Sequence, residues 1–103
     1  MLTILIPAFN EERAIGAVIA GIPNDIAGLR TSVVVIDDGS TDATAAAARH
    51  SGAEVIRLDT NHGKGAAMRH GRSYAVALAS DVVVAIDADG QHDPTCVPDL
   101  VAP

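Results

Sequence analysis

The chain has 103 residues, of which 49% are hydrophobic and 19% are charged, and its formal net charge at pH 7 is −6. This length suits one small domain, residues 1–103, and the apolar content excludes an intrinsically disordered protein. The negative charge argues against nucleic acid or an anionic membrane as the main partner, because both would repel the chain.

The apolar pattern predicts strands and helices in strict alternation. In chain order they are residues 2–6 (strand), 11–22 (helix), 32–36 (strand), 43–51 (helix), 54–58 (strand), 64–79 (helix) and 81–86 (strand). Pro7 is expected to stop the first strand, Asn10 to cap the first helix, and residues 24–31 to form a loop. The strands read as uninterrupted apolar runs, which is typical of strands covered on both faces. The predicted fold class is therefore α/β, a Rossmann-like parallel sheet with helices on both faces.

Polar residues follow each predicted strand, and ligands bind at the carboxyl edge of such sheets. Asp87 and Asp89 are two residues apart after the last strand, and Gln91 follows them. Carboxylate and amide oxygens are the ligands that Mg²⁺ and Mn²⁺ prefer, so these three residues predict a metal site. The alternative is an ordinary turn rich in Asp and Gly.

Two other loops carry groups suited to a nucleotide. Asp37 and Asp38 are adjacent at the end of a strand, and burying both without partners would be costly. We expect one to cap backbone N–H groups and the other to accept hydrogen bonds from a ligand; alternatively, both are turn residues. Lys64 lies between two glycines at the start of a helix, which favours a nearby phosphate, although a solvated loop lysine is the alternative.

Four segments together resemble the motifs of family 2 glycosyltransferases, and the resemblance covers essentially the whole chain. They are residues 4–12 (ILIPAFNEE), 35–42 (VIDDGSTD), 61–67 (NHGKGAA) and 87–92 (DADGQH). The last segment is similar to the form of the D-x-D motif in polyprenyl-phosphate hexosyltransferases, which include dolichol-phosphate mannosyltransferases. The resemblance implies the amino-terminal, nucleotide-sugar-binding half of a GT-A fold.

The resemblance also implies a role for each matching residue. Pro7, Ala8 and Glu11 would border the nucleoside, with Phe9 packed against it, and Asp38 would hydrogen-bond the nucleobase. Lys64 would lie near the nucleotide phosphates. The residues that would hold Mg²⁺ or Mn²⁺ against the diphosphate are Asp87, Asp89 and Gln91. The catalytic residue itself is unknown, because any base is expected in a carboxyl-terminal part of the family fold that lies beyond this sequence.

The implied function is an inverting transferase that moves a sugar from a GDP- or UDP-sugar to an acceptor such as a polyprenyl phosphate. One alternative is a binding-only nucleotide module without turnover. Another is a haloacid-dehalogenase-type phosphatase, whose nucleophile motif the Asp87–Gly90 segment resembles, although that motif belongs to the first strand of its fold. The chain would also expose a sheet edge and self-associate as a homo-oligomer.

The expected location is the cytoplasm, with the protein soluble or peripheral at a membrane. The single cysteine, Cys96, excludes an internal disulfide and fits a reducing compartment. No apolar run reaches the roughly 20 residues of a membrane-spanning helix. No basic residue precedes the first apolar run, as it would in a signal peptide.

Overall fold

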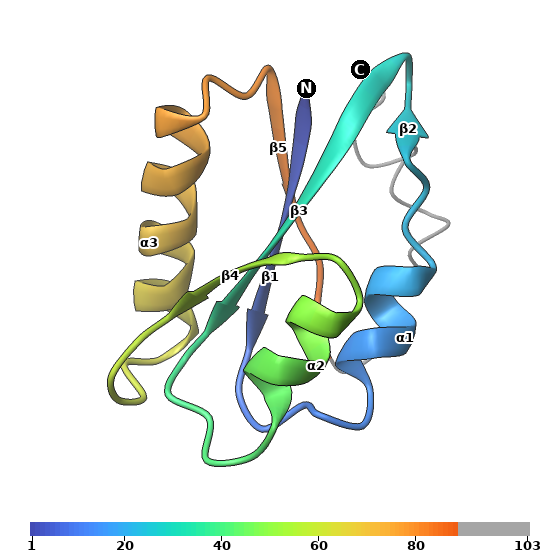
Figure 1. The fold of residues 1–103 in the computed structure, drawn as a ribbon. Coiled ribbons are helices and arrows are strands. Elements are labelled where there is room, and N and C mark those ends of the chain that lie inside the picture. Colours follow the sequence, from blue (N-terminus) through green and yellow to red (C-terminus); the bar gives the residue numbers. More distant parts are fainter. Residues whose placement is uncertain (89–103) are drawn as a thin grey trace.

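The computed structural model describes residues 1–88, which form an open sheet with helices on both faces (Figure 1). Its parallel strands have the spatial order β4-β3-β1-β5, so β1 lies in the middle. The parallel strands are β1 (Leu2–Ala8), β3 (Leu29–Asp37), β4 (Glu54–Arg57) and β5 (Val82–Ala85). The predicted α/β class with a Rossmann-like sheet is confirmed, because these four strands run parallel and helices lie between them along the chain.

The central strand β1 is longer than predicted, since it continues through Pro7 to Ala8. Proline lacks an N–H group and is tolerated in a sheet only where no ladder bond is required. The backbone N–H and C=O groups of Leu5 face β5, and its carbonyl accepts from the N–H of Ile86. The backbone of Pro7, two residues further along the strand, faces the same side. The N–H group that Pro7 lacks would therefore point past Ala85, the last residue of β5 that pairs with β1, so no ladder bond is lost. On the β3 side, the carbonyl of Ala8 still accepts the N–H of Asp38.

A short antiparallel hairpin occupies part of the segment that was predicted to be a loop. Strand β2 (Asp25–Ile26) pairs with the start of β3, and the turn between them contains Ala27 and Gly28. Both turn residues have positive φ, 52° and 79°, as the two central residues of a type I′ hairpin turn require. The sheet is therefore mixed rather than purely parallel, and β3 begins three residues earlier than expected.

Three helices cover the two faces of the sheet. Helices α1 (Ile15–Ala20) and α2 (Thr44–His50) pack on one face, and α3 (Lys64–Ala77) covers the other (Figure 1). Helix α1 is shorter than predicted, and Asn10 is not its N-cap. Asn10 instead has a φ of 52° and accepts the N–H of Thr41 through its side-chain oxygen.

The core has two parts, one on each side of the sheet, and both consist of aliphatic side chains. On the α1 and α2 side, alternate residues of β1 such as Ile4 and Ile6 pack against Ile15 and Val18. On the α3 side, Leu5, Val34 and Ile36 pack against the helix. Because β1 pairs in parallel with both β3 and β5, the carboxyl ends of these three strands lie at the same edge of the sheet. No helix within residues 1–88 is long and apolar enough to cross a membrane.

Candidate nucleotide-sugar site

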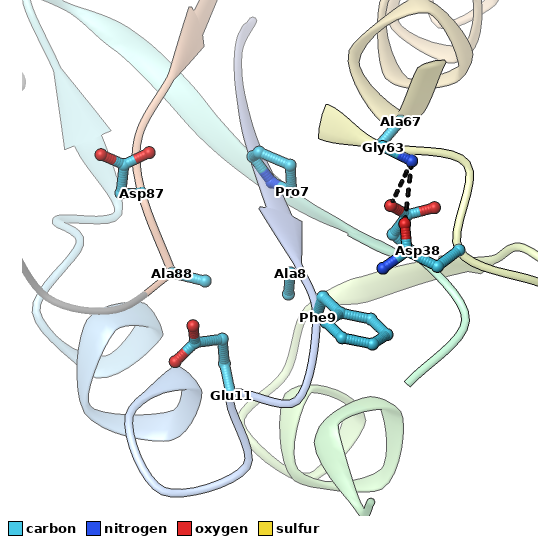
Figure 2. Close-up of a pocket in the computed structure, with 10 residues that line it drawn as sticks. Pro7, Ala8, Phe9, Glu11, Asp38, Gly63, Ala67, Asp87 and Ala88 are labelled. Atoms are coloured by element: carbon cyan, nitrogen blue, oxygen red, sulfur yellow. Dashed lines mark hydrogen bonds between the residues drawn. The ribbon is translucent and has the colours of Figure 1, made fainter. Parts of the chain in front are cut away.

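A pocket of about 270 Å³ opens at the carboxyl edge of the sheet, where β1, β3 and β5 end. Its floor is the end of the central strand, and its walls come from the segments that follow β3, β4 and β5 (Figure 2). The residues that line it are Pro7, Ala8, Phe9, Glu11, Asp38, Asn61, Gly63, Ala67, Asp87 and Ala88.

The structure brings together all the residues that the family resemblance assigns to the nucleotide, except Lys64, around this one pocket. Lys64 is the first residue of α3 and directly follows the pocket residue Gly63. In Figure 2, Asp38 and Asp87 lie on opposite sides of Pro7 and Ala8. This follows from the strand order, because β3 and β5 flank β1. Two strand spacings place β3 and β5, the strands that precede Asp38 and Asp87, about 10 Å apart.

Asp37 and Asp38 have different roles, although they are neighbours in sequence. Asp37 is fully buried, and one of its oxygens accepts the N–H of Ser40 at 2.9 Å, which closes the turn after β3. Its other oxygen has no hydrogen bond within the described structure and lies 3.8 Å from the Nε atom of Arg57. The Arg57 guanidinium also donates to the carbonyl of Ser40, so it supports the same turn.

Asp38 is less free for a ligand than expected, because its carboxylate already accepts two backbone N–H groups. One oxygen accepts from His62 at 2.8 Å and the other from Gly63 at 2.9 Å. Only 4% of the residue is exposed. Asp38 therefore holds the segment after β4 against the end of β3, and it also lines the pocket.

Gly39 allows this close approach of two backbone segments. Its φ is 77°, and a Cβ atom at this position would lie 2.5 Å from the carbonyl carbon of Thr60 and 2.7 Å from the nitrogen of Asn61. Real Cβ contacts are essentially never so short. Glycine is thus required at this position for both its conformation and its lack of a side chain.

A second set of hydrogen bonds ties the loop after β1 to the start of α2. The N–H groups of Asn10 and Glu11 donate to the hydroxyls of Ser40 and Thr44, each at 2.9 Å. In return, the Glu12 carboxylate accepts the N–H of Ala43 at 3.2 Å. These bonds determine the position of the loop that carries Phe9 and Glu11 into the pocket.

Asp42 belongs to the same network and stays ionised at neutral pH. It accepts hydrogen bonds from the hydroxyl and the N–H of Thr44. These bonds, led by the one from the Thr44 hydroxyl, hold the pKa of the Asp42 carboxyl below its ordinary value. The other carboxylate oxygen of Asp42 accepts the N–H of Glu12 at 3.4 Å.

The predicted metal ligands are only partly covered by the structure. Asp87 is half-buried, follows β5 and lines the pocket. Asp89 and Gln91 lie outside the described residues. Within residues 1–88 no group of three His, Cys, Asp or Glu side chains is arranged to hold a metal. The metal site therefore remains a prediction, with Asp87 as the ligand candidate that the structure describes.

The pocket is acidic, which restricts the ligands that it can hold. Glu11, Asp38 and Asp87 contribute carboxylates, and the described lining residues include no lysine or arginine. A diphosphate placed beside Asp87 would be repelled unless a cation lay between them. The donor set therefore fits a divalent metal bound together with a phosphorylated ligand.

Sequence reasoning did not assign four of the lining residues, namely Asn61, Gly63, Ala67 and Ala88. The signal for Asn61 and Gly63 was present, because both belong to the segment that resembles a family motif. Gly63 donates its N–H to Asp38, which follows another strand, and to the side-chain oxygen of Asn61, and no local pattern reveals the first of these contacts.

Proteins with similar sequences include named sugar-transferring enzymes. A glucosyl-3-phosphoglycerate synthase of Mycobacterium tuberculosis (strain ATCC 25618 / H37Rv) is 40% identical over 111 residues, covering 99% of this chain and 33% of that protein. A dodecaprenyl-phosphate galacturonate synthase of Rhizobium johnstonii is 32% identical over 109 residues, covering 98% of this chain and 31% of the relative. The chain spans only about 40% of the length of other relatives that it matches.

A solved structure shows the same fold. It is the Mycobacterium tuberculosis glucosyl-3-phosphoglycerate synthase in complex with Mn²⁺, uridine diphosphate and glucosyl-3-phosphoglycerate. Its TM-score with this chain is 0.76 at 37% sequence identity, over 98% of this chain and 38% of that one. The family model described as glycosyl transferase family 2 matches residues 3–103. This chain therefore belongs to glycosyl transferase family 2.

Proposed function

We propose that this chain is the donor-binding part of a glycosyltransferase and binds a nucleoside diphosphate sugar together with Mg²⁺ or Mn²⁺. The observation that carries the proposal is the placement of Asp38 and Asp87 on either side of the end of β1, across one acidic pocket. Crystal complexes of a structural neighbour contain UDP with Mn²⁺ or with Mg²⁺, and another contains UDP-glucose with Mn²⁺. These complexes support a nucleotide-sugar donor here.

In this proposal each part of such a donor contacts a different part of the pocket. The base lies between Asp38 and Phe9, the chain's only phenylalanine, whose ring is 41% exposed. Exposed aromatic rings at a pocket rim provide a surface on which a base stacks. Pro7, Ala8 and Glu11 border the ribose, and the diphosphate extends toward Asp87. The separation of about 10 Å between β3 and β5, the strands that precede the two aspartates, suits this extended arrangement.

In this proposal Asp87, with Asp89 and Gln91 beyond the described residues, holds the divalent ion, and Lys64 contributes to the phosphate side. A bound divalent ion stabilises the negative charge that builds on the departing nucleoside diphosphate. The protein's own residues bind the base, orient the sugar-phosphate bond toward the open side of the pocket and keep the diphosphate beside Asp87.

For the acceptor we propose a polyprenyl phosphate. The support is the DADGQH segment at residues 87–92 and the Rhizobium johnstonii relative, which is named for a dodecaprenyl phosphate. The enzyme would then work at the cytoplasmic surface of a membrane as a peripheral protein. The haloacid-dehalogenase alternative fails, because Asp87 follows β5 rather than a first strand and the family match includes the motif.

Titration of the chain with UDP and GDP, each with and without Mn²⁺, tests the donor site. We expect binding that depends on the metal, and we expect Asp87→Asn to weaken it at least about tenfold, because a charged ligand to the metal is lost. Isothermal calorimetry measures both effects. The exposed Asp59, which does not line the pocket, provides a matched control, and Asp59→Asn should bind as the wild type does.

The outcome separates the competing functions. Absence of metal-dependent binding at millimolar nucleotide would overturn the donor site. Metal-dependent binding without sugar transfer or hydrolysis of the donor would favour the alternative of a non-catalytic nucleotide-binding module.

We further propose that the chain self-associates through the edge of β5. Among the described strands β5 pairs only with β1, and Val83 on this strand is 41% exposed. A free strand edge with apolar side chains is a template for pairing with a second copy. Light scattering should show a mass above that of the monomer, and Val83→Lys should lower it, since charge on an edge strand opposes pairing. A monomer at high concentration would contradict this proposal.

A further inference from the structure

Helix α3 concentrates positive charge in an otherwise acidic chain. Residues 60–80, which include the whole helix, contain three of the seven basic side chains of the chain, Lys64, Arg69 and Arg72, and none of its thirteen acidic ones. The next acidic residue along the chain, Asp81, forms an ion pair with the N-terminal ammonium group at 2.5 Å. The helix is therefore a locally basic element, although the net charge of the chain is −6.

The packing of α3 on the sheet determines which of its side chains face outward. Ala67, Gly71 and Ala75 are buried and recur at every fourth residue. A Cβ atom on Gly71 would lie 2.8 Å from the side chain of Ile36 in β3, so this face of the helix lies directly against the sheet. Among residues 1–88 no second helix lies on this side of the sheet (Figure 1). The opposite face of α3 is therefore turned toward solvent.

Arg69, Arg72 and Val76 lie on this outer face, because spacings of three and four residues bring side chains to the same side of a helix. All three are exposed, and Val76, at 78%, is more exposed than any other large hydrophobic residue that the structure describes. Within residues 1–88 neither arginine forms an ion pair or a hydrogen bond through its side chain. Both guanidinium groups are thus available to an anionic partner.

A shallow depression of about 150 Å³ lies beside Arg69 on the same helix. It is lined by Ala66, Arg69, His70 and Ser73, so it combines a guanidinium, an imidazole and a hydroxyl group. Guanidinium and hydroxyl groups are donors that suit phosphate oxygens. At the carboxyl end of the helix, residues 76–79 are four consecutive exposed apolar residues. The outer side of α3 therefore has phosphate-binding donors in its middle and an apolar tip.

Resting on the polyprenyl phosphate acceptor proposed above, we infer that the outer face of α3 docks on the surface of an anionic lipid bilayer. The arginines contact headgroup phosphates, and the tip at residues 76–79 enters the boundary of the apolar layer. Binding of a helix at a membrane surface draws on both terms, attraction to anionic lipids and burial of apolar area. Gly63 and Ala67, at the start of α3, line the nucleotide pocket, so docking through this helix brings the pocket to the bilayer where such an acceptor lies.

The negative charge of the whole chain does not prevent this orientation. At physiological ionic strength exposed charges more than about 8 Å apart are largely screened, so the bilayer responds mainly to the face that it touches. An acidic protein would match the two arginines equally well. The exposed apolar tip beside them and an acceptor that resides in a bilayer favour lipid as the partner.

Co-sedimentation with lipid vesicles tests this surface. We expect the chain to bind vesicles that contain phosphatidylserine but not vesicles of phosphatidylcholine alone, and added salt should weaken the binding. The variant Arg69→Gln/Arg72→Gln should bind about 25-fold more weakly, because each basic side chain near an anionic bilayer contributes about fivefold. The matched control is Arg13→Gln/Arg49→Gln, which removes the same charge from exposed positions before α1 and on α2 and should bind as the wild type does.

Insertion of the tip has a separate readout, because the chain contains no tryptophan. Val76→Trp introduces a single indole fluorophore, whose emission should shift to shorter wavelengths when phosphatidylserine vesicles are added, since tryptophan favours the membrane interface. Ala46→Trp places the same fluorophore at an exposed position of α2, on the other face of the sheet, and its emission should not shift.

Equal vesicle binding by the two double variants would overturn the assignment to α3. Absence of binding by the wild type would overturn the docking surface altogether, and this comparison decides even where a variant fails to fold. Capture of an acidic protein without vesicle binding would assign the face to a protein partner instead. Titration with UDP and Mn²⁺ separates this inference from the donor site, because neither arginine lines the nucleotide pocket. Nucleotide binding without vesicle binding would overturn only the docking surface, and the reverse result would overturn only the donor site.

Discussion

Replacing Gly39 with alanine should lower the free energy of unfolding by about 2–4 kcal/mol and abolish nucleotide binding. The new Cβ would lie 2.5 Å from the carbonyl carbon of Thr60, and backbone atoms cannot move aside as a flexible side chain can. The positive φ of 77° adds strain of about 1 kcal/mol or more for alanine. A small domain has a free energy of unfolding of roughly 5–15 kcal/mol, so this loss is large.

The effect on binding follows from where the displaced backbone lies. Thr60 and Asn61 begin the segment whose next residues, His62 and Gly63, donate to Asp38. Separating this segment from Gly39 would break those bonds and open the base end of the pocket. Loss of binding should therefore accompany the loss of stability, and both are measurable by urea unfolding and calorimetry.

Gly28 provides the matched control. Its φ of 79° is almost the same, but a Cβ there would meet no atom within 4 Å. Gly28→Ala should cost only the backbone strain, about 1 kcal/mol, and leave nucleotide binding intact. Equal losses of stability in the two variants would show that the contact with Thr60 is unimportant.

Asp38→Ala should lower the free energy of unfolding by about 2–4 kcal/mol and remove nucleotide binding. The substitution leaves the N–H groups of His62 and Gly63 without their acceptor, and an unsatisfied backbone group costs about 1–3 kcal/mol when buried. Both hydrogen bonds are only part-buried, so the combined cost of losing them lies below that of two fully buried groups. Chemical denaturation measures the first effect and calorimetry the second.

The control for Asp38 is Asp59→Ala, which removes an exposed carboxylate from the neighbouring loop. Surface changes of this kind usually stay within about 0.5 kcal/mol of the wild type. If Asp38→Ala lost nucleotide binding but kept full stability, Asp38 would act on the ligand alone and would not hold the 62–63 segment.

The architecture was predictable because it depends on local patterns. Continuous apolar runs indicate strands buried on both faces, and helical spacing of apolar residues indicates the covering helices. The errors fall where pairing partners decide the structure. Pro7 was expected to end β1, yet the strand continues to Ala8. The N–H group that proline lacks would point past the end of β5, where no partner requires it. The hairpin of β2 was missed because two residues give no periodicity.

The nucleotide pocket could be anticipated in outline. Parallel strands place their following loops at one edge, so Asp38, Phe9 and Asp87 were expected to converge, and they line one pocket. Their functional roles remain predictions, as does metal binding by Asp87, Asp89 and Gln91. The role of Asn10 was misjudged, since a side chain that reaches Thr41 from another loop has no signature in its own neighbourhood.

The sequence by itself determined the fold class, the family resemblance and the set of loops that form the site, because these follow from residue type and spacing along the chain. Only the tertiary structure decided how the Asp38 carboxylate is used. Its partners His62 and Gly63 are 24 and 25 residues away, and they meet it because Gly39 lets two backbones approach. That contact places the 61–63 segment beside Asp38 at the pocket, so the shape of this wall depends on packing between loops that no local sequence pattern reveals.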